Sequence, residues 1–289
     1  MPGARSLAFR HVITHVPRMP NPYSAQLVSL EGADAIAFAQ AQFSSNLAGL
    51  ADGRWQFGAW LDAQGRVRAL FHLLRVDEQR LRLLLRGGEA GAFAAALQRY
   101  VFRAKVRITT DVRAMGTGEP LALHTSDASK GTFALGCGSH SLVVGERDDD
   151  TWRLPQLRAG WPWLPASLLG ELLPASLELG PLGATALDKG CYPGQEIVAR
   201  LHYRGGNKRH LRHVQLSRPL TPGAVLREGD QVFAQLLDVV PVDGAAEALA
   251  VVHEGFTKNL HGGLHATHEA QPVHIRSAEH APCTRERGR

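Results

Sequence analysis

The chain has few cysteines and lacks a long apolar run. Its 289 residues include only Cys137, Cys191 and Cys283, an odd number with wide spacing. They form no CxxC pair and no disulfide framework, which fits a reducing compartment, so the role of any cysteine must be individual. The longest apolar candidate, residues 161–173, is interrupted by two prolines, a glycine and a glutamate. It is too broken to be a membrane helix.

The sequence also lacks the short motifs of several enzyme classes. It contains no Walker loop, GxGxxG, HExxH or GxSxG, so nucleotide-binding, zincin and hydrolase functions have no support. Charge is modest, with a formal net value of +5, which permits an anionic partner without requiring one. Apolar residues make up 44% and charged residues 20%, as in a soluble globular protein with two or three compact units.

Acidic residues are absent from the first nineteen positions, which carry Arg5, Arg10 and Arg18. No apolar block or small-residue cleavage site accompanies them, so a secretory signal is not expected. We expect residues 1–19 to be a flexible tail on a bacterial cytoplasmic protein. The alternative is a mitochondrial presequence, which would direct the protein to the matrix.

Hydrophobic periodicity predicts an α+β unit after this tail. Alternating segments and turn residues indicate strands, and an Ala-rich segment and a segment opening at Asp34 indicate helices. The order is β-α-β-β-β-α-β, typical of an antiparallel sheet with helices on one face. The predicted elements are 26–30, 34–43, 54–61, 66–76, 80–86, 91–100 and 105–109.

The predicted organisation has four parts. Residues 1–19 form the tail, residues 20–204 form two α+β subdomains divided near residue 115, and residues 205–256 form a small β-barrel of short strands. Residues 257–289 are interpreted as a mobile, His-rich tail. His261, His265 and His268 have helical spacing, but Gly262 and Gly263 oppose a helix there. No metal site is therefore expected.

The most informative segment is K-G-C-Y-P-G-Q-E, residues 189–196. Pro193 and Gly194 predict a turn, so Cys191 should lie at a bend. A helix should begin at Gly194 and end at Gly205. Its positive end and the Lys189 ammonium would both lower the pKa of the thiol and make Cys191 a reactive thiolate. The alternative is a buried, inert cysteine that only fills space.

This segment resembles the signature of YgfZ-type proteins, K-G-C-[YF]-x-G-Q-E, which are relatives of the glycine-cleavage T-protein. The resemblance continues through Val198-Ala199-Arg200 and Arg204-Gly205. Asp62-Ala63-Gln64-Gly65-Arg66 resembles the first hairpin of the family, and Trp152 with Ala159-Gly160-Trp161-Pro162 resembles a segment associated with folate.

The resemblance implies a T-protein-like ring of subdomains, with antiparallel sheets around a central folate pocket and a C-terminal β-barrel. It implies tetrahydrofolate as the cofactor. Trp152 would stack on the pterin, and Tyr192, Gln195, Glu196 and Arg204 are assigned to the same site. Cys191 and Lys189 would be the reactive pair, and Cys191 would share an iron–sulfur cluster transiently with a partner, because one thiolate cannot hold a cluster alone.

Three functions follow as hypotheses. The leading one is a folate-binding accessory protein for iron–sulfur enzymes, including those that thiomethylate tRNA; its partners would be iron–sulfur client proteins and, indirectly, tRNA-modifying enzymes, with no membrane. The second is a tetrahydrofolate-dependent aminomethyltransferase, although Ser44-Ser45-Asn46 stands where the T-protein has its catalytic aspartate. The third is an RNA-binding module built on the basic turn 204–213, which lacks interleaved aromatics. Because the leading hypothesis is an accessory role, we do not expect a classical enzyme; if the protein is one, it would be aminomethyltransferase-like.

Overall fold

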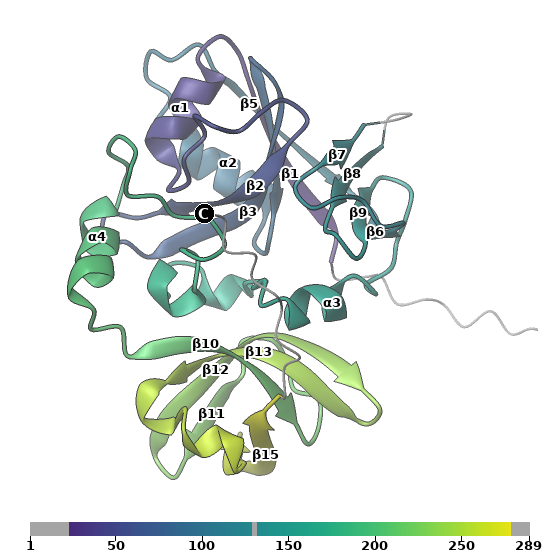
Figure 1. The fold of residues 1–289 in the computed structure, drawn as a ribbon, viewed down its shortest axis with the longest axis vertical. Helices are drawn as coiled ribbons and strands as arrows, with labels where there is room; N and C mark the ends of the chain where they lie inside the picture. Colours follow the sequence, from purple (N-terminus) through teal and green to yellow (C-terminus); the bar gives the residue numbers. More distant parts are fainter. Residues whose placement is uncertain (1–22, 129–131, 279–289) are drawn as a thin grey trace, which may run out of the picture.

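The computed structural model describes residues 23–128 and 132–278, which form three packed parts (Figure 1). A sheet with two helices lies at one end, a closed barrel lies at the other, and a small second sheet lies beside the first. The expected tail at residues 1–19 lies outside the described residues, as do residues 279–289. No helix in the described segments has the length and apolar character needed to cross a membrane.

The first sheet has five antiparallel strands in the order β2-β3-β4-β1-β5. Its β2–β3 turn closes where the Gly65 N–H donates to the Asp62 carbonyl at 2.9 Å, as the Asp and Gly of this turn predicted. The strands are β1 (Ala25–Glu31), β2 (Trp55–Leu61), β3 (Val67–Asp77), β4 (Arg80–Leu85) and β5 (Arg107–Arg113).

The two faces of this sheet have different neighbours. Helices α1 (Ala35–Gln42) and α2 (Ala90–Gln98) share a buried apolar cluster with one face. The opposite face belongs to a second cluster that also contains side chains of the second sheet, α3 and the barrel. The predicted α+β arrangement with helices on one face is confirmed. The second cluster joins all three parts.

The second sheet has four short strands in the order β6-β9-β8-β7 and leads into an irregular segment with few regular elements. The strands are β6 (Met115–Gly118), β7 (Ser126–Asp127), β8 (Phe133–Gly136) and β9 (Ser141–Val144). Helix α3 (Arg153–Arg158) follows, and then come two 3-10 turns, Ala166–Leu168 and Pro174–Leu177.

The last part is a closed six-stranded barrel, in agreement with the predicted β-barrel. Its strands are β10 (Arg209–Leu216), β11 (Val225–Glu228), β12 (Gln231–Val242), β13 (Ala245–His253), β14 (Leu264–His268) and β15 (Gln271–Ser277). Two 3-10 turns, Glu254–Phe256 and Asn259–His261, connect β13 to β14.

The boundary predicted at residue 256 is wrong, because the His-rich segment completes this barrel. Leu264 and Ala266 of β14 and Val273 and Ile275 of β15 are buried in the apolar interior of the barrel. Strand β15 pairs with β10 and β14, and β14 pairs with β11, so neither β14 nor β15 has a free edge. The histidines and glycines that interrupt the sequence pattern lie in the turns and at outward positions.

Two ion pairs fix α3 against the barrel. Arg153 pairs with Asp238, both almost completely buried, and Asp238 also accepts a hydrogen bond from the Tyr23 hydroxyl at 3.2 Å. Arg158 pairs with Glu247, which a ring nitrogen of His213 also contacts at 2.8 Å. Burial of the first pair makes removal of one partner costly, since the other charge would stay uncompensated. The barrel is thereby held to the rest of the molecule.

Candidate functional site

Helix α4 (Gln195–Arg204) follows the cysteine loop directly and lies at the side of the molecule, between the first sheet and the barrel (Figure 1). Gly194 precedes the helix with a φ of 77°, and Gly205 ends it with a φ of 67°. Both values belong to the left-handed region that glycine adopts without steric cost. The predicted helix and its glycine boundaries are confirmed.

The cysteine loop is packed tightly against the β2–β3 turn. A Cβ atom added to Gly194 would lie 2.5 Å from the Asp62 carbonyl oxygen and 2.7 Å from the Cα of Gly65. One added to Gly65 would lie 2.9 Å from the Cβ of Ile197 on α4. The two sequence segments that resemble the family, 62–66 and 189–196, therefore meet in space, and their glycines permit the contact.

Lys189 fixes the other side of the loop. Its ammonium donates hydrogen bonds to the carbonyl oxygens of Gln40, Phe43 and Ser45, at 2.5, 2.6 and 2.9 Å. Burial lowers the pKa of Lys189 to about 8, whereas the carbonyls at the C-terminal end of α1 favour the charged form. An ammonium has three protons, and all three are used here. None remains to hydrogen-bond the Cys191 sulfur, so the contacts of Lys189 fix the backbone of the loop rather than the thiol.

Tyr192 is the buried anchor of the loop. Its side chain is almost fully buried, and its hydroxyl donates to the Ala186 carbonyl at 2.9 Å. Burial raises the pKa of this hydroxyl to about 12. The Lys189 ammonium lies 5.1 Å from the centre of the Tyr192 ring, in cation–π range. Residues 189 and 192 thus hold the cysteine between them.

Cys191 itself is exposed and lines an open groove of about 550 Å³. The interpretation of this residue as a buried, space-filling cysteine is wrong. The groove runs between the cysteine loop and one side of α4, with the tip of the β2–β3 turn at its edge. Its lining residues are Ala63, Leu187, Cys191, Tyr192, Pro193, Gly194, Gln195, Glu196, Ala199 and Tyr203.

The three sides of α4 have different environments. Gln195, Ala199 and Tyr203 recur every four residues and line the groove. Arg200 and Arg204 lie on the adjacent stripe and are exposed, and Arg204 is not among the groove residues. The apolar side contacts the molecule without burying any residue fully. The structure therefore brings Tyr192, Gln195 and Glu196 together around Cys191 and leaves Arg204 outside the groove.

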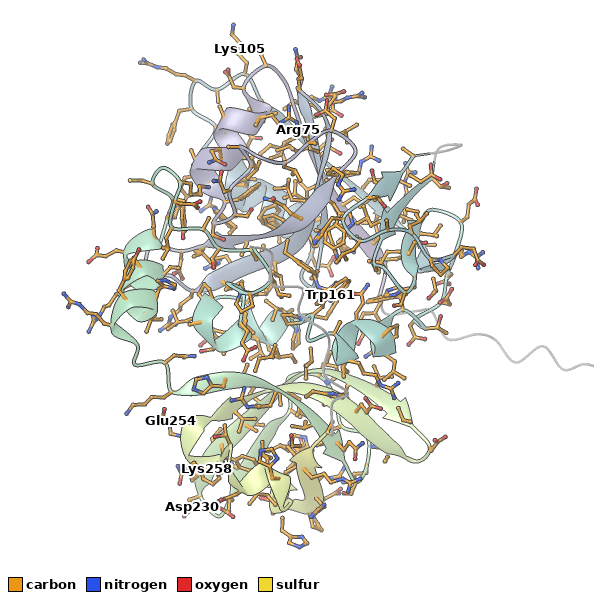
Figure 2. The ribbon with its side chains drawn as sticks, viewed as in Figure 1. Arg75, Lys105, Trp161, Asp230, Glu254 and Lys258 are labelled. Atoms are coloured by element: carbon orange, nitrogen blue, oxygen red, sulfur yellow. The ribbon has the colours of Figure 1, made fainter. Side chains whose placement is uncertain are left out.

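Trp152 lies apart from this groove. Its side chain is completely buried, and its indole N–H donates to the Asp149 carbonyl at 3.1 Å. Tyr23 and Trp163 pack against the ring, with centroid distances of 5.8 and 5.1 Å. In this packing neither face of the indole is open to a pterin. Trp161, from the same segment, is only partly buried and lies in the middle of the molecule (Figure 2).

Sequence reasoning missed a buried polar cluster centred on Arg86. The guanidinium donates to the carbonyl oxygens of Pro162 and Trp161, at 2.8 and 2.9 Å, and to Gln156 Oε1 at 2.7 Å. Burial lowers the pKa of Arg86 to about 10. The only available signal was an arginine at the end of the apolar run 83–85, just before two glycines. Its role is to hold residues 156–162 across the inner face of the sheet.

The segment that replaces the T-protein aspartate also has structural contacts. Ser44 and Ser45 are completely buried, and Ser44 donates to the Ala184 carbonyl at 2.7 Å. The Asn46 side-chain oxygen, Oδ1, accepts hydrogen bonds from the Gln40 side chain and from the backbone N–H of Ala48. These side chains are hydroxyls and an amide, and none of them can act as a carboxylate base.

Across residues 23–128 and 132–278, no group of three His, Cys, Asp or Glu side chains converges to hold a metal ion. His265 and His274 face each other on β14 and β15, with ring centroids 5.0 Å apart. His261 lies in the preceding 3-10 turn, and His268 contacts the Val225 carbonyl at 3.1 Å. The histidines of this region are thus divided among separate contacts.

Comparisons with known proteins point to one family, although no family model matches the chain. An uncharacterised protein of Haemophilus influenzae is 31% identical over 196 residues, covering 64% of this chain and 68% of that protein. The tRNA-modifying protein YgfZ of Aliivibrio fischeri strain ES114 is 27% identical, covering 78% of this chain and 82% of that protein. The protein of the same name from Sodalis glossinidius is 26% identical, with 68% and 74% covered.

Among solved structures, the glycine cleavage system aminomethyltransferase T of Bartonella henselae aligns with a TM-score of 0.66. The alignment covers 88% of this chain and 82% of that chain, at 14% identity. At that identity the likeness establishes the fold alone, which is the T-protein-like α+β arrangement expected from the sequence. In its cysteine motif and along most of its length, the chain is similar to the YgfZ proteins, and its fold is that of the T-protein.

Proposed function

We propose that this protein is a folate-binding accessory protein that supports iron–sulfur enzymes, tRNA-modifying enzymes among them, through the thiol of Cys191. The observation that carries this proposal is the position of Cys191, exposed in an open groove on a loop held by Lys189, Tyr192 and the β2–β3 turn. Several relatives bear the name tRNA-modifying protein. We assign the activity to the reducing cytoplasm of a bacterium, where a free thiol persists.

The chemistry assigned to Cys191 needs a second molecule. The common iron–sulfur clusters take about four cysteine ligands, so one thiolate can bind a cluster only together with ligands of a partner. An exposed thiol on a fixed loop suits such sharing, because a partner reaches the sulfur without unfolding the loop. The N-terminal turn of α4, which contributes Gln195 and Glu196 to the groove, adds a positive end of a helix dipole near the thiol.

The groove also fits a folate headgroup better than the surroundings of Trp152 do. Small-molecule sites typically enclose about 300–1,000 Å³, a range that includes this groove. The Glu196 carboxylate and the Gln195 amide oxygen can accept hydrogen bonds from the amino and ring N–H groups of a pterin. A bound reduced folate would supply a one-carbon carrier beside the thiol. Trp152 is sealed by Tyr23 and Trp163 and does not fit the role of a direct contact.

The aminomethyltransferase alternative is not favoured, because residues 44–46 offer no carboxylate where the T-protein has its catalytic aspartate. A base is needed there to move protons at the folate amine. The accessory role has no such requirement.

The thiol role is tested by complementation. In a bacterial strain deleted for its own YgfZ-type gene, Cys191→Ala should lower tRNA thiomethylation, measured by mass spectrometry of tRNA nucleosides, at least about ten-fold relative to the wild-type chain. Cys137→Ala is the matched control and should retain the modification at equal protein abundance. Full complementation by the Cys191 variant would contradict the proposal.

The folate site is tested by calorimetric titration with 5-formyl-tetrahydrofolate, a stable reduced folate. Glu196→Gln should weaken binding about ten-fold, because it removes a charged acceptor from the headgroup. Trp152→Phe should leave the affinity within about two-fold, because its ring is sealed from the groove. The reverse pattern would move the ligand from the groove to the centre of the molecule.

A further inference from the structure

Four exposed basic side chains, which we call the basic ridge, lie on α4 and on the residues that follow it. Arg200 and Arg204 belong to the helix, Lys208 and Arg209 follow it, and all four are exposed. Within the described parts of the chain, none of the four takes part in an ion pair. Glu196 lies one helical turn before Arg200 on the same side of α4, and the backbone N–H of Glu254 donates to the Lys208 carbonyl at 2.8 Å. Two carboxylates therefore lie near these cations without forming an ion pair with them in the described residues.

The backbone beneath the basic ridge is fixed. Asn207, in the turn between the two pairs of cations, accepts a hydrogen bond from the Ser176 hydroxyl at 3.0 Å and donates one to the Arg209 carbonyl at 2.6 Å. Arg200 and Arg204 are one helical turn apart and so lie on the same side of α4. Arg200 and Arg204 thus share one side of α4, and Lys208 and Arg209 follow in a turn that Asn207 holds in place. A phosphate backbone can contact such a series of exposed cations.

An aromatic ring lies beside these cations. Tyr203 is 76% exposed, which is unusual for so large a side chain. Its ring makes a T-shaped contact with the His202 ring, at 4.9 Å between centroids, and most of its surface stays open to solvent. The basic turn 204–213 itself contains no Phe, Tyr or Trp, and Tyr203 directly precedes it on α4. Exposed aromatic faces stack on unpaired bases.

We propose that the basic ridge and Tyr203 form a docking surface for single-stranded RNA. Arg200, Arg204, Lys208 and Arg209 contact successive phosphates, and Tyr203 stacks on an unpaired base above the groove of Cys191. The aromatic ring favours RNA over an acidic peptide, because a peptide carboxylate gains nothing from an exposed phenol face. This inference goes beyond the accessory role proposed above, which requires only protein partners. It adds direct contact with nucleic acid beside the thiol.

A second basic segment offers a matched control. Arg99, Arg103, Lys105 and Arg107 are exposed, and the neighbouring Phe102 is 86% exposed. Lys105 lies at the far end of the first sheet, remote from the barrel, whereas α4 adjoins the barrel (Figures 1 and 2). Removing four cations there changes the net charge by the same amount as removing the basic ridge, but leaves the surface around Cys191 intact.

The test is fluorescence anisotropy of the full chain with a labelled twelve-nucleotide single-stranded RNA of mixed sequence. With four phosphate contacts, affinity should fall about 50-fold between about 50 and 200 mM salt, given a slope of about −0.7 for each contact on a single strand. The variant with all four ridge cations changed to Gln should bind at least about 20-fold more weakly at low salt. Tyr203→Leu should bind about ten-fold more weakly and keep the salt slope of the wild type.

Four outcomes would overturn the proposal. Equal losses in the ridge variant and in the variant with residues 99, 103, 105 and 107 changed to Gln would reduce the binding to generic electrostatics. Unchanged binding by Tyr203→Leu, or equal affinity for a duplex of the same length, would remove the stacking contact. Displacement of the RNA by an equimolar poly-glutamate peptide would assign the basic ridge to an acidic protein. Folate binding in the groove does not depend on these results.

Discussion

The two cysteines within the described residues occupy opposite environments. Cys137 is 8% exposed, its thiol donates to the Leu135 carbonyl at 3.3 Å, and burial raises its pKa to about 12. Cys191 is exposed at the edge of a groove. The two side chains are identical, so the difference comes from their surroundings. Cys137 fills space in the interior, whereas a partner can reach Cys191.

The supports of the two thiols differ as well. Cys137 belongs to the buried cluster of Arg86, His72 and Gln156, in which the Gln156 amide nitrogen lies 3.8 Å from the sulfur. Cys191 has a fixed backbone and a free side chain, because Lys189 and Tyr192 anchor the loop on both sides. Rigid backbone with an open side chain is the arrangement expected of a functional residue on a loop.

Alkylation should show the largest difference between the two thiols. In a Cys283→Ser background at about pH 7.5, iodoacetamide should modify Cys191 at least about 100-fold faster than Cys137. Burial keeps the Cys137 thiol protonated, and its contacts exclude the reagent. Peptide mass spectrometry over time gives both rates in one sample.

Denaturant is the internal control for alkylation, because unfolding should bring the two rates within about three-fold of each other. Comparable alkylation rates of Cys191 and Cys137 in the native protein would contradict the view that only Cys191 is accessible.

A substitution at Gly194 tests whether its contact with the β2–β3 turn fixes the backbone of the Cys191 loop. Gly194→Ala places a Cβ 2.5 Å from the Asp62 carbonyl in a backbone conformation with φ of 77°. We expect a loss of about 2–4 kcal/mol in the free energy of unfolding, measured by urea denaturation, from steric conflict and left-handed strain.

Gly190→Ala is the matched control for this substitution. It lies in the same loop and has no heavy atom within 4 Å of the added Cβ, so its effect should stay within about 0.5 kcal/mol. Equal effects of the two variants would show that the contact with the β2–β3 turn does not hold the loop.

The buried cluster around Cys137 should make the protein sensitive to acid. Burial, followed by the charge of Arg86, lowers the pKa of His72 well below its usual value. Below a pH of about 6.5 the unfolded chain binds a proton that folded His72 does not, so stability falls as the pH falls. Between about pH 6.5 and 5, this residue should contribute a loss of about 2 kcal/mol. Lowered pKa values of His124 and His140 act in the same direction.

Urea denaturation at the two pH values measures this loss. His72→Asn should reduce the pH dependence by about 2 kcal/mol. An identical pH dependence in wild type and His72→Asn would contradict the role of His72.

Local sequence signals were sufficient for much of the fold. The strands of the first sheet, both of its helices and α4 followed from apolar spacing and from turn residues such as Gly65 and Gly205. The thiol loop was predictable because Pro193 and Gly194 specify a bend in any context. These features depend on neighbours within a few residues.

What failed depends on contacts between distant segments. Burial of Trp152 is produced by Tyr23 and Trp163, which no local pattern connects. The strands at 264–277 are short and rich in histidine, and only pairing with β10 and β11 makes them part of a barrel. The hydrogen bonds of Lys189 to the end of α1 could not be predicted from the sequence either. The role expected for its ammonium was therefore an effect on the neighbouring Cys191 thiol.

The carbonyl groups that hold Lys189 lie 144 to 149 residues earlier in the chain. During synthesis on the ribosome, the end of α1 emerges long before Lys189 is made. The carbonyl groups at the end of α1 therefore cannot form these hydrogen bonds until Lys189 has been added to the chain. A nascent chain that ends before Lys189 lacks both the ammonium that holds the loop and the sulfur of Cys191. The loop that carries the thiol therefore gains its Lys189 contacts only after the chain has been made as far as residue 189.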